Sequence, residues 1–375
     1  MKVPVAKPYL DKAEEKAVIE VIRSGWVTQG PKVMEMEEQF KALTGKKYAV
    51  ATSSATTALF LSLYLLDIGP GDEVLVPSFT FIATSNVIVQ TGAKPVFVEI
   101  DPLTYNMDPK DLEKKITKKA KAIMPVDQVG LPCDMDAIRK IAKRYKLFIV
   151  EDSACAIGSQ YKGKSVGHYA DLTCFSFHPR KVVTTGDGGM LVTDNKDWAA
   201  RAKMLRQQGM GTSDLVRNKA NQVIHESYPE IGFNFRMTDI QAAVGVEQMK
   251  KLPKFLRLRK AIAEKYTKAF LKTELVIPPH VPKYATPNWQ SYIVRLKKNS
   301  KISRDELMQG LLDLGISTRR GIMSIHREEP YIKKFGKISL PVTSEATDQT
   351  ISLPIYTQMT KVEQDHVINN ILKLV

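Results

Sequence analysis

LTCFSFHPRKVVTTGDGGMLVTD, residues 172–194, contains two short apolar runs separated by a loop with Lys181 and three glycines. Runs of this length that are apolar throughout predict strands buried on both faces of a sheet. A lysine directly behind such a strand lies at the edge of the sheet, where it can form a Schiff base with a carbonyl compound. Most lysines of a basic chain are only surface charges, so the neighbouring segments must decide between these interpretations.

The same pattern extends toward the N-terminus. Strand-like runs occur at residues 48–51, 73–76, 95–99, 121–126 and 147–152, and helical stretches lie between them, among them 56–66, 82–89 and 134–146. Such alternation predicts an α/β core with a mostly parallel, doubly wound sheet. Ligands bind these sheets at the carboxyl ends of the strands, so functional residues are expected just past each strand.

The C-terminal part shows a different pattern. A helix is predicted from residue 238 to 252, where Pro253 is expected to end it, and a charged helix from there to about 272. Proline-rich sequence follows (VIPPHVPKYATPN, residues 276–288), then a strand at 291–296 and a helix at 304–314. A chain of 375 residues is long enough for two domains. We therefore place a large domain at residues 1–249 and a smaller α+β domain at 250–375.

The composition limits the possible classes of protein. It is that of a globular chain, with 43% hydrophobic and 25% charged residues. No apolar run approaches the ~18 residues of a membrane span, and the first residues lack the apolar core of a signal peptide, so we expect a cytoplasmic protein without membrane contact. Cys133, Cys155 and Cys174 show no zinc-type spacing, which favours free thiols and no metal site.

The net charge of +15 leaves two interpretations open. Lysines and arginines are spread along the whole chain, and no nucleic-acid-binding motif is present, so a solvated basic surface is the simpler one. A basic mouth for an anionic small substrate fits the same charge. Binding to nucleic acid is not expected.

Three groups of residues follow predicted strands and could bind one ligand. Ser54, Ala55 and Thr56 open a helix whose free N–H groups suit a phosphate, although a plain N-cap has the same sequence. Asp152 ends the strand LFIVED and could face a cationic ring nitrogen, or it could cap a helix. Lys181 follows the strand that ends at Ser176, whose hydroxyl could hold a phosphate. Together they supply a phosphate cradle, an acid and a lysine at one sheet edge.

At this point the sequence resembles the DegT/DnrJ/EryC1/StrS family of fold-type-I sugar aminotransferases. The resemblance covers nearly the whole chain. It rests on the blocks SGWVTQGPKV (24–33), SSATTAL (53–59), GDEVLVPSFTFIATSN (71–86), VEDSACAIGSQYKGKSVG (150–167), FSFHPRKVVTTGDGGM (175–190), IGFNFRMTDIQAAVG (231–245) and GISTRRGIMSIH (315–326).

The resemblance implies pyridoxal 5′-phosphate (PLP) as cofactor and assigns roles to matching residues. Lys181 would form the Schiff base and move the proton between Cα and the cofactor, and Asp152 would pair with the pyridine nitrogen. Phe81 would stack on the ring, Cys155 would lie near the 3′-oxygen, and Ser176 with the Ser54–Thr56 segment would hold the phosphate. Asn234 would reach that phosphate from the second subunit, which implies a homodimer.

The implied reaction moves an amino group from glutamate or glutamine to a keto sugar, expected to be linked to a nucleotide, in amino-sugar or polysaccharide biosynthesis. Arg236, Arg319, Arg320 and His326 are candidates for binding the diphosphate of such a substrate. A PLP-dependent sugar dehydratase, a keto-cyclitol aminotransferase and a PLP-binding regulator of nucleic acid are the alternatives. The family's dehydratases carry His in place of the Schiff-base lysine, so Lys181 favours a transaminase.

Four positions depart from the family pattern. Cys155 stands where Gln or His is frequent, and Asp127 stands where His is common. Asp187 replaces the Glu of a GEGG segment, and Gln290 replaces a His of the small domain. None of the four replaces the proposed Schiff-base lysine, but they bear on the substrate and on the surroundings of the cofactor oxygen.

Overall fold

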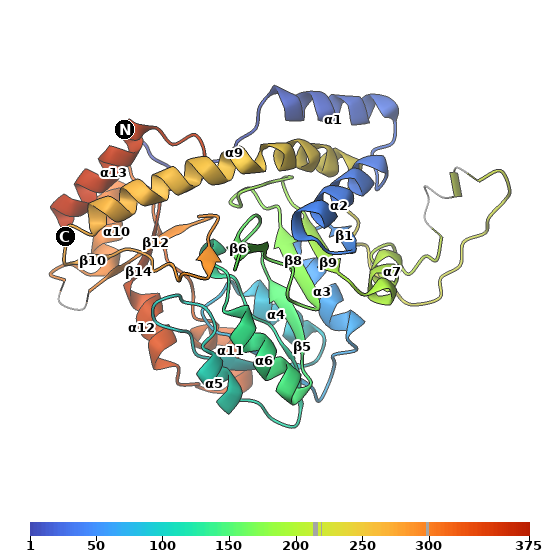
Figure 1. The fold of residues 1–375 in the computed structure, drawn as a ribbon, viewed down its shortest axis with the longest axis horizontal. Helices are drawn as coiled ribbons and strands as arrows, with labels where there is room; N and C mark the ends of the chain where they lie inside the picture. The colour runs from blue at the N-terminus through green and yellow to red at the C-terminus, as the bar shows by residue number, and fades with distance from the viewer. Residues whose placement is uncertain (213–216, 219, 298–299) are drawn as a thin grey trace.

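The computed structural model describes residues 1–212, 217–218, 220–297 and 300–375, and a seven-stranded sheet forms its centre (Figure 1). The strands follow the spatial order β1 (Tyr48–Thr52), β9 (Gly189–Thr193), β8 (Leu172–Ser176), β5 (Phe148–Asp152), β4 (Ala120–Ile123), β2 (Glu73–Pro77) and β3 (Lys94–Val98). From β8 to β3 all neighbours are parallel, whereas β9 is antiparallel to both β1 and β8. The predicted α/β fold with a mostly parallel sheet is confirmed.

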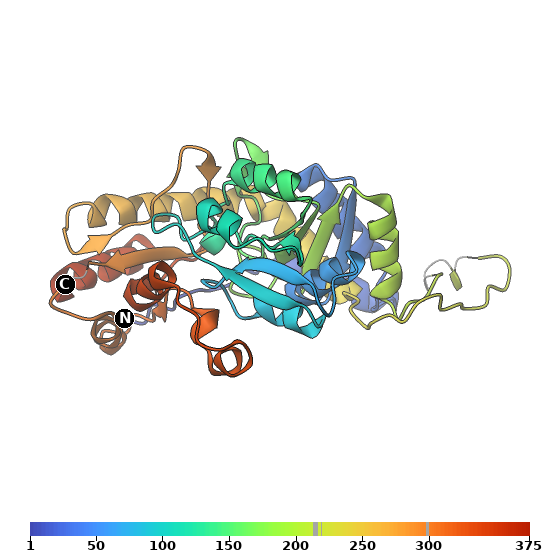
Figure 2. The same cartoon turned by 90° about the horizontal axis from the view of Figure 1, so that it is seen from below.

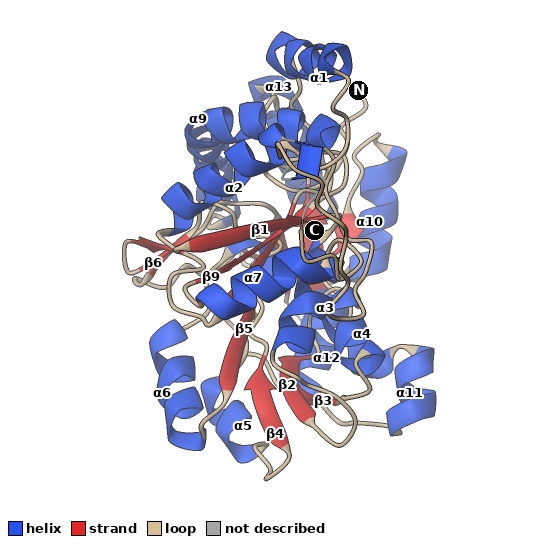
Figure 3. Ribbon diagram, turned by 90° about the vertical axis from the view of Figure 1, so that its right-hand side faces the viewer, coloured by secondary structure: helices blue, strands red, loops and turns tan. Residues whose placement is uncertain are grey.

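Helices cover both faces of this sheet (Figure 3). One face packs against α3 (Ala55–Leu65), α4 (Ala83–Gln90) and α7 (Lys196–Leu205). The other packs against α2 (Pro31–Thr44), α5 (Pro109–Lys114), α6 (Met135–Tyr145) and the first half of α9 (Asp239–Phe270). Within β1, Val50 packs with the first set of helices, while Ala49 and Ala51 pack against the second. Burial on both sides explains why most residues of these strands are apolar.

A smaller antiparallel sheet lies at the other end of the molecule (Figures 1 and 2). Its order is β10 (Val276–Ile277), β12 (Tyr292–Leu296), β14 (Thr350–Leu353) and β13 (Arg319–Arg320). It shares a core with α10 (Arg304–Asp313), α13 (Lys361–Leu374) and the second half of α9. The remaining elements are η1 (Gln128–Gly130), η2 (Ile325–Arg327), α11 (Glu329–Phe335), α12 (Pro341–Gln349) and a three-stranded sheet of β11 (Ala285–Thr286), β6 (Gln160–Tyr161) and β7 (Lys164–Ser165).

Helix α9 joins the two sheets and passes through the domain boundary expected at residue 249. The prediction that Pro253 ends this helix is wrong, because the proline lies inside one continuous helix. An interior proline costs about 3 kcal/mol, but Leu252 and Phe255 are buried beside it against the large sheet, and their burial offsets that cost. Neither α9 nor any other described helix is apolar enough over a sufficient length to span a bilayer. The division at residue 249 stays a prediction.

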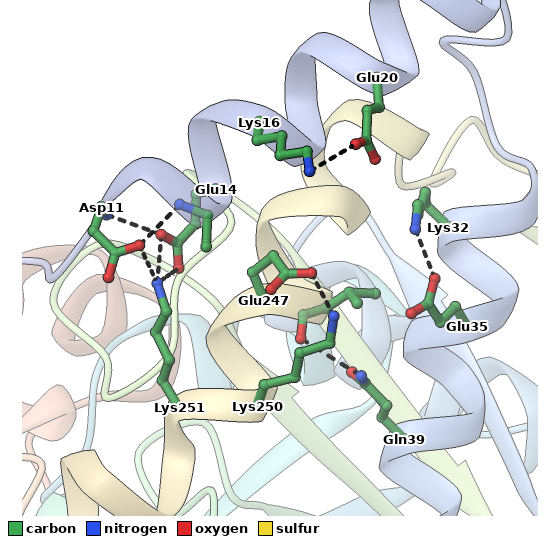
Figure 4. A network of polar contacts seen from close by, with 12 residues as sticks. Asp11, Glu14, Lys16, Glu20, Lys32, Glu35, Gln39, Glu247, Lys250 and Lys251 are labelled. Atoms are coloured by element: carbon green, nitrogen blue, oxygen red, sulfur yellow. Dashed lines mark hydrogen bonds and ion pairs between the residues drawn. The ribbon is translucent and has the colours of Figure 1, made fainter.

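The N-terminal helix α1 (Lys12–Ser24) is held on α9 by a partly buried ionic cluster (Figure 4). A capping box begins the helix: Ala13 N donates to Asp11 Oδ1 and Asp11 N donates to Glu14 Oε2, both at 2.9 Å. Lys251 Nζ lies 2.7 Å from a carboxylate oxygen of each of the two acids. The hydrogen bond from Lys251 is the main cause that lowers the pKa of Asp11 to about 2.

Between α7 and α9 the chain leaves the body as a long arm, described at residues 208–212, 217–218 and 220–232 (Figure 1). At its base Gln208 N donates to Phe233 O at 2.8 Å, and Gln207 pairs with Asn234 as an antiparallel bridge. Farther along, Val223 and Ile231 are 85% and 84% exposed. Exposed apolar side chains gathered on one segment are typical of surfaces that contact another protein.

Candidate active site

Four strand ends lie side by side at the carboxyl edge of the parallel strands. Gly189, the first residue of β9, pairs with Thr52 at the end of β1 and with Ser176 at the end of β8. Asp152, the last residue of β5, pairs with Cys174 of β8. The loops behind these strand ends hold the predicted phosphate, acid and lysine groups. The sheet topology therefore brings the three groups to one edge.

The N-terminus of α3 forms one wall of this edge. Ser54 caps the helix, since its Oγ accepts a hydrogen bond from Thr57 N at 3.2 Å, and Thr57 Oγ1 accepts one from Ser54 N at 3.1 Å. The N–H groups of Ala55 and Thr56 open the helix and have no acceptor within it. A Cβ on Gly189 would lie 2.3 Å from the carbonyl carbon and oxygen of Ser54. Only glycine lets β9 pass this close to the start of the helix.

Ser176 completes this wall from the neighbouring strand. Its side chain is 8% exposed, and its Oγ accepts a hydrogen bond from His178 N at 3.4 Å. Through Gly189, which pairs with Ser176 and packs on the Ser54–Ala55 backbone, the hydroxyl comes next to the first turn of α3. A helix N-terminus with an adjacent hydroxyl is the kind of cradle that binds a phosphate group.

Asp152 is a buried carboxylate with two donors. Thr84 Oγ1 donates to its Oδ2 at 2.8 Å, and Ala154 N donates to its Oδ1 at 3.1 Å. Burial is the main influence and raises the pKa of Asp152, while the hydrogen bond from Thr84, that from Ala154 and the positive charge of Lys181 act in the opposite direction. A carboxylate in such a place is suited to pair with a cation.

Lys181 extends from the loop behind β8 toward the loop behind β5. Its Nζ donates a hydrogen bond to Cys155 Sγ at 3.0 Å. Its own backbone N–H donates to His178 O at 2.8 Å, which fixes the turn that carries it. The amine, the thiol and the carboxylate of Asp152 thus lie on adjoining strand ends, and the charge of Lys181 acts on Asp152.

Phe81 lies on the loop between β2 and α4, and its side chain is 64% exposed. Thr84 N donates to Phe81 O at 3.1 Å, so Phe81 and Thr84 belong to one turn. Thr84 is also the residue whose hydroxyl donates to Asp152. Sequence reasoning identified Phe81 but not Thr84. No local pattern marks Thr84, because its role arises only when α4 packs beside the end of β5.

Two further contacts come from residues just before β12. Asn288 is buried, and its Nδ2 donates to Cys155 O at 2.8 Å and to Ile157 O at 2.9 Å. Gln290 Nε2 donates to Arg180 O at 2.9 Å, next to Lys181. The sequence drew attention to Gln290 but gave no signal for Asn288. The segment that leads into the small sheet therefore ties together the two loops that carry the thiol and the amine.

Asp127 lies behind Asp152 rather than at the open edge. It is fully buried, and Ser153 Oγ and Cys133 N donate to its two carboxylate oxygens at 2.6 and 2.9 Å. Burial, together with the nearby negative charge of Asp152, raises the pKa of Asp127 to about 6. The carboxyl therefore supports the loop that follows β5.

The predicted substrate-binding cations lie in different surroundings. His326 is buried, with Nδ1 at 2.7 Å from Ser78 Oγ and Nε2 at 3.3 Å from Ser344 Oγ, and burial lowers its pKa. It thereby holds the loop that leads to Phe81. Arg319 and Arg320 are exposed on the short strand β13 of the small sheet.

Asn234 and Arg236 lie at the base of the arm. Asn234 is exposed, and Arg236 is half-buried. Ser53 N donates to Phe235 O at 2.8 Å, so this segment runs beside the loop between β1 and α3. The base of the arm therefore borders the proposed phosphate cradle.

Two known proteins resemble this chain in sequence over nearly its whole length. The chain is 37% identical over 376 residues to the spore coat polysaccharide biosynthesis protein SpsC of Bacillus subtilis, covering 99% of this chain and 97% of SpsC. An uncharacterised protein of Methanocaldococcus jannaschii is 39% identical over 375 residues, with 99% and 97% of the two chains covered.

Solved structures of aminotransferases superpose closely on this chain. The aminotransferase TlmJ of Streptoalloteichus hindustanus superposes with a TM-score of 0.91 at 32% identity over 98% of this chain and 97% of TlmJ. PseC of Helicobacter pylori, an aminotransferase involved in pseudoaminic acid biosynthesis, gives a TM-score of 0.94 at 29% identity over 100% and 99% of the two chains. Residues 8–372 match the DegT/DnrJ/EryC1/StrS aminotransferase family, and the chain belongs to this family of PLP-dependent enzymes.

Proposed function

We propose that this aminotransferase moves an amino group from glutamate or glutamine to the keto group of a nucleotide-linked sugar, with Lys181 as the residue that carries PLP. The observation that supports this most is that Lys181 and the buried carboxylate of Asp152 lie at one sheet edge, where the charge of Lys181 acts on Asp152. The names of SpsC and PseC, which refer to polysaccharide and amino-sugar biosynthesis, support a sugar as the amino acceptor.

The residues of this edge fit PLP group by group. The cradle of Ser54, Ala55, Thr56 and Ser176, which a side chain at Gly189 would obstruct, suits the phosphate. Asp152 suits the pyridine nitrogen, and the exposed ring of Phe81 suits the face of the pyridine. Cys155, beside the Lys181 amine, would lie next to the 3′-oxygen. Bound PLP supplies an electron sink that stabilises negative charge at the reacting carbon.

The protein groups then divide the work. The Asp152 carboxylate would hold a proton on the ring nitrogen. An ion pair with that nitrogen would offset the free-energy cost of burying the negative charge of Asp152. Thr84 and Ala154 keep the carboxylate in place through its two oxygens. Lys181 Nζ would take up and return a proton at the reacting carbon of the substrate. Transamination needs such a mobile amine at this point.

We also propose that the enzyme acts as a homodimer and that Asn234 reaches the phosphate of the partner subunit. The arm supports this, because Val223, Tyr228 and Ile231 expose large apolar surfaces that a second subunit would cover. Asn234 is exposed at the base of the same segment. Arg236, Arg319, Arg320 and His326 stay candidates for the diphosphate of the substrate, and His326 would need to exchange its Ser78 or Ser344 partner for it.

The test is incubation of the PLP-loaded enzyme with a panel of nucleotide-linked keto sugars and keto-cyclitols and either amino donor, followed by mass spectrometry. Replacement of a keto oxygen by an amine on the sugar is the expected result. A product that has lost water instead would favour the dehydratase, and amination of a keto-cyclitol alone would favour the second alternative. A PLP-binding regulator would instead show salt-dependent DNA binding and no product.

A further inference from the structure

Cys155 differs from the other two cysteines of the chain in its surroundings. Cys133 and Cys174 are 0% exposed, and burial raises the pKa of each thiol well above its ordinary value. Cys155 is only partly buried and has the Lys181 amine 3.0 Å from its sulfur. Reactive cysteines occur in partly exposed places beside cationic groups, whereas fully buried ones are inert. An oxidant would therefore act at Cys155.

The thiol and the amine are held together from both sides. The loop of Cys155 is tied by the bond from Ala154 N to Asp152 and by the bonds from Asn288 to Cys155 O and Ile157 O. The loop of Lys181 is tied by Gln290 Nε2, which donates to Arg180 O at 2.9 Å. Because Asn288 and Gln290 belong to one segment, the two loops keep a fixed spacing. The sulfur and nitrogen are thus presented to each other by a built arrangement.

We propose that Cys155 and Lys181 form a peroxide-sensitive switch in which a covalent S–N bond takes the lysine out of use. A peroxide oxidises the thiol to a sulfenic acid and is itself reduced, with hydrogen peroxide giving water. Lys181 Nζ then attacks the sulfur, the hydroxyl leaves as water with one amine proton, and a sulfenamide remains. Two equivalents of an added thiol reverse this, since they become a disulfide and return the free thiol and amine.

The effect on the enzyme rests on the role proposed above for Lys181. An amine bonded to sulfur cannot carry PLP or move a proton, so the switched form is inactive. Conversely, a lysine nitrogen held by PLP as an imine has no hydrogen to lose, so it cannot form a neutral sulfenamide. Pyridoxamine 5′-phosphate has no aldehyde and leaves Lys181 free. The S–N bond can therefore form in the pyridoxamine phosphate form of the enzyme but not in the PLP form.

The experiment treats the enzyme with hydrogen peroxide in both forms and maps its proteolytic peptides without reductant. In the pyridoxamine phosphate form we expect one crosslinked product that joins the Cys155 and Lys181 peptides, two hydrogens lighter than their sum. It should be absent from the PLP form and from Cys155→Ser, and dithiothreitol should release it. Cys133 and Cys174 serve as internal controls and should stay unmodified.

The proposal is overturned if, in the pyridoxamine phosphate form, Cys155 is recovered as a thiol or as a sulfinic or sulfonic acid while Lys181 stays free. Because the readout is a peptide mass, it does not depend on turnover. A crosslink in protein that aminates no sugar would support the switch and contradict the proposed function. An active enzyme without the crosslink would overturn the switch alone.

Discussion

Gly189→Ala tests the proposed phosphate cradle without replacing any residue that is proposed to bind the phosphate. The added Cβ would lie 2.3 Å from the carbonyl carbon and oxygen of Ser54 and 2.6 Å from Ala55 N. These are backbone atoms and cannot rotate away, so the start of α3 has to move by about 1 Å from β9 to reach ordinary contact, at a cost of roughly 1–3 kcal/mol in stability.

That displacement moves the Ala55 and Thr56 N–H groups away from Ser176. A hydrogen bond to a charged group contributes about 1.5–3 kcal/mol, and every ~1.4 kcal/mol is a tenfold change in affinity. Loss of one phosphate contact should therefore weaken PLP binding by about 10- to 100-fold. The change should appear in Kd for PLP.

The assay is a titration of cofactor-free enzyme with PLP, followed by visible absorbance. Gly69→Ala is the matched control, because a Cβ there meets only Thr91 O at 3.7 Å and should leave PLP affinity unchanged. Ser176→Ala gives a second reading without added volume and should also weaken binding. Wild-type PLP affinity in both Gly189→Ala and Ser176→Ala would refute the cradle.

Three other predictions concern charge, hydrogen bonding and assembly. The folded-state pKa of Asp127 is raised to about 6. The stability that this residue contributes is therefore fully present below the ordinary pKa of aspartate and is lost as the pH rises through 6. Asp127→Asn should therefore gain roughly 1–3 kcal/mol of unfolding free energy at pH 7.5 relative to its effect at pH 4; equal effects in urea melts at both pH values would contradict this. The Thr84 hydrogen bond lowers the pKa of Asp152, so Thr84→Val should move the acid limb of the kcat/KM profile to higher pH, and an unshifted limb would argue against a required Asp152 carboxylate. Ile231→Asp removes about 1.5–3 kcal/mol of apolar burial from each arm, so the dimer dissociation constant should rise by roughly 10²- to 10⁴-fold, and light scattering that shows an unaltered dimer would exclude the arm from the interface.

The large sheet was predictable from the sequence because its strands are buried on both faces and carry a strong signal. Residues 147–150 are all apolar and residues 172–177 mostly so, and the matching strands β5 and β8 occur where expected. Asp152 and Lys181 follow these strands, so their place at one edge could be inferred from the topology of parallel sheets alone.

Other parts depend on contacts between distant segments and leave no local pattern. Thr84 reaches Asp152 across 68 residues of sequence, and Asn288 reaches Cys155 across 133. Pro253 misled the prediction of α9 because local propensity favours a helix end, while burial of Leu252 and Phe255 keeps the helix whole. The arm between α7 and α9 likewise has no strong periodic signal, since Val223, Tyr228 and Ile231 are exposed and do not pack against the core of this chain.

The most direct test of the role given to Lys181 is to reduce the PLP-loaded enzyme with borohydride, which fixes the cofactor to whichever lysine carries it, and to map the labelled peptide. We expect a single phosphopyridoxyl label on Lys181, and none on this peptide after Lys181→Arg. A label on another lysine would contradict the account, and so would a protein that shows no visible absorbance from bound PLP.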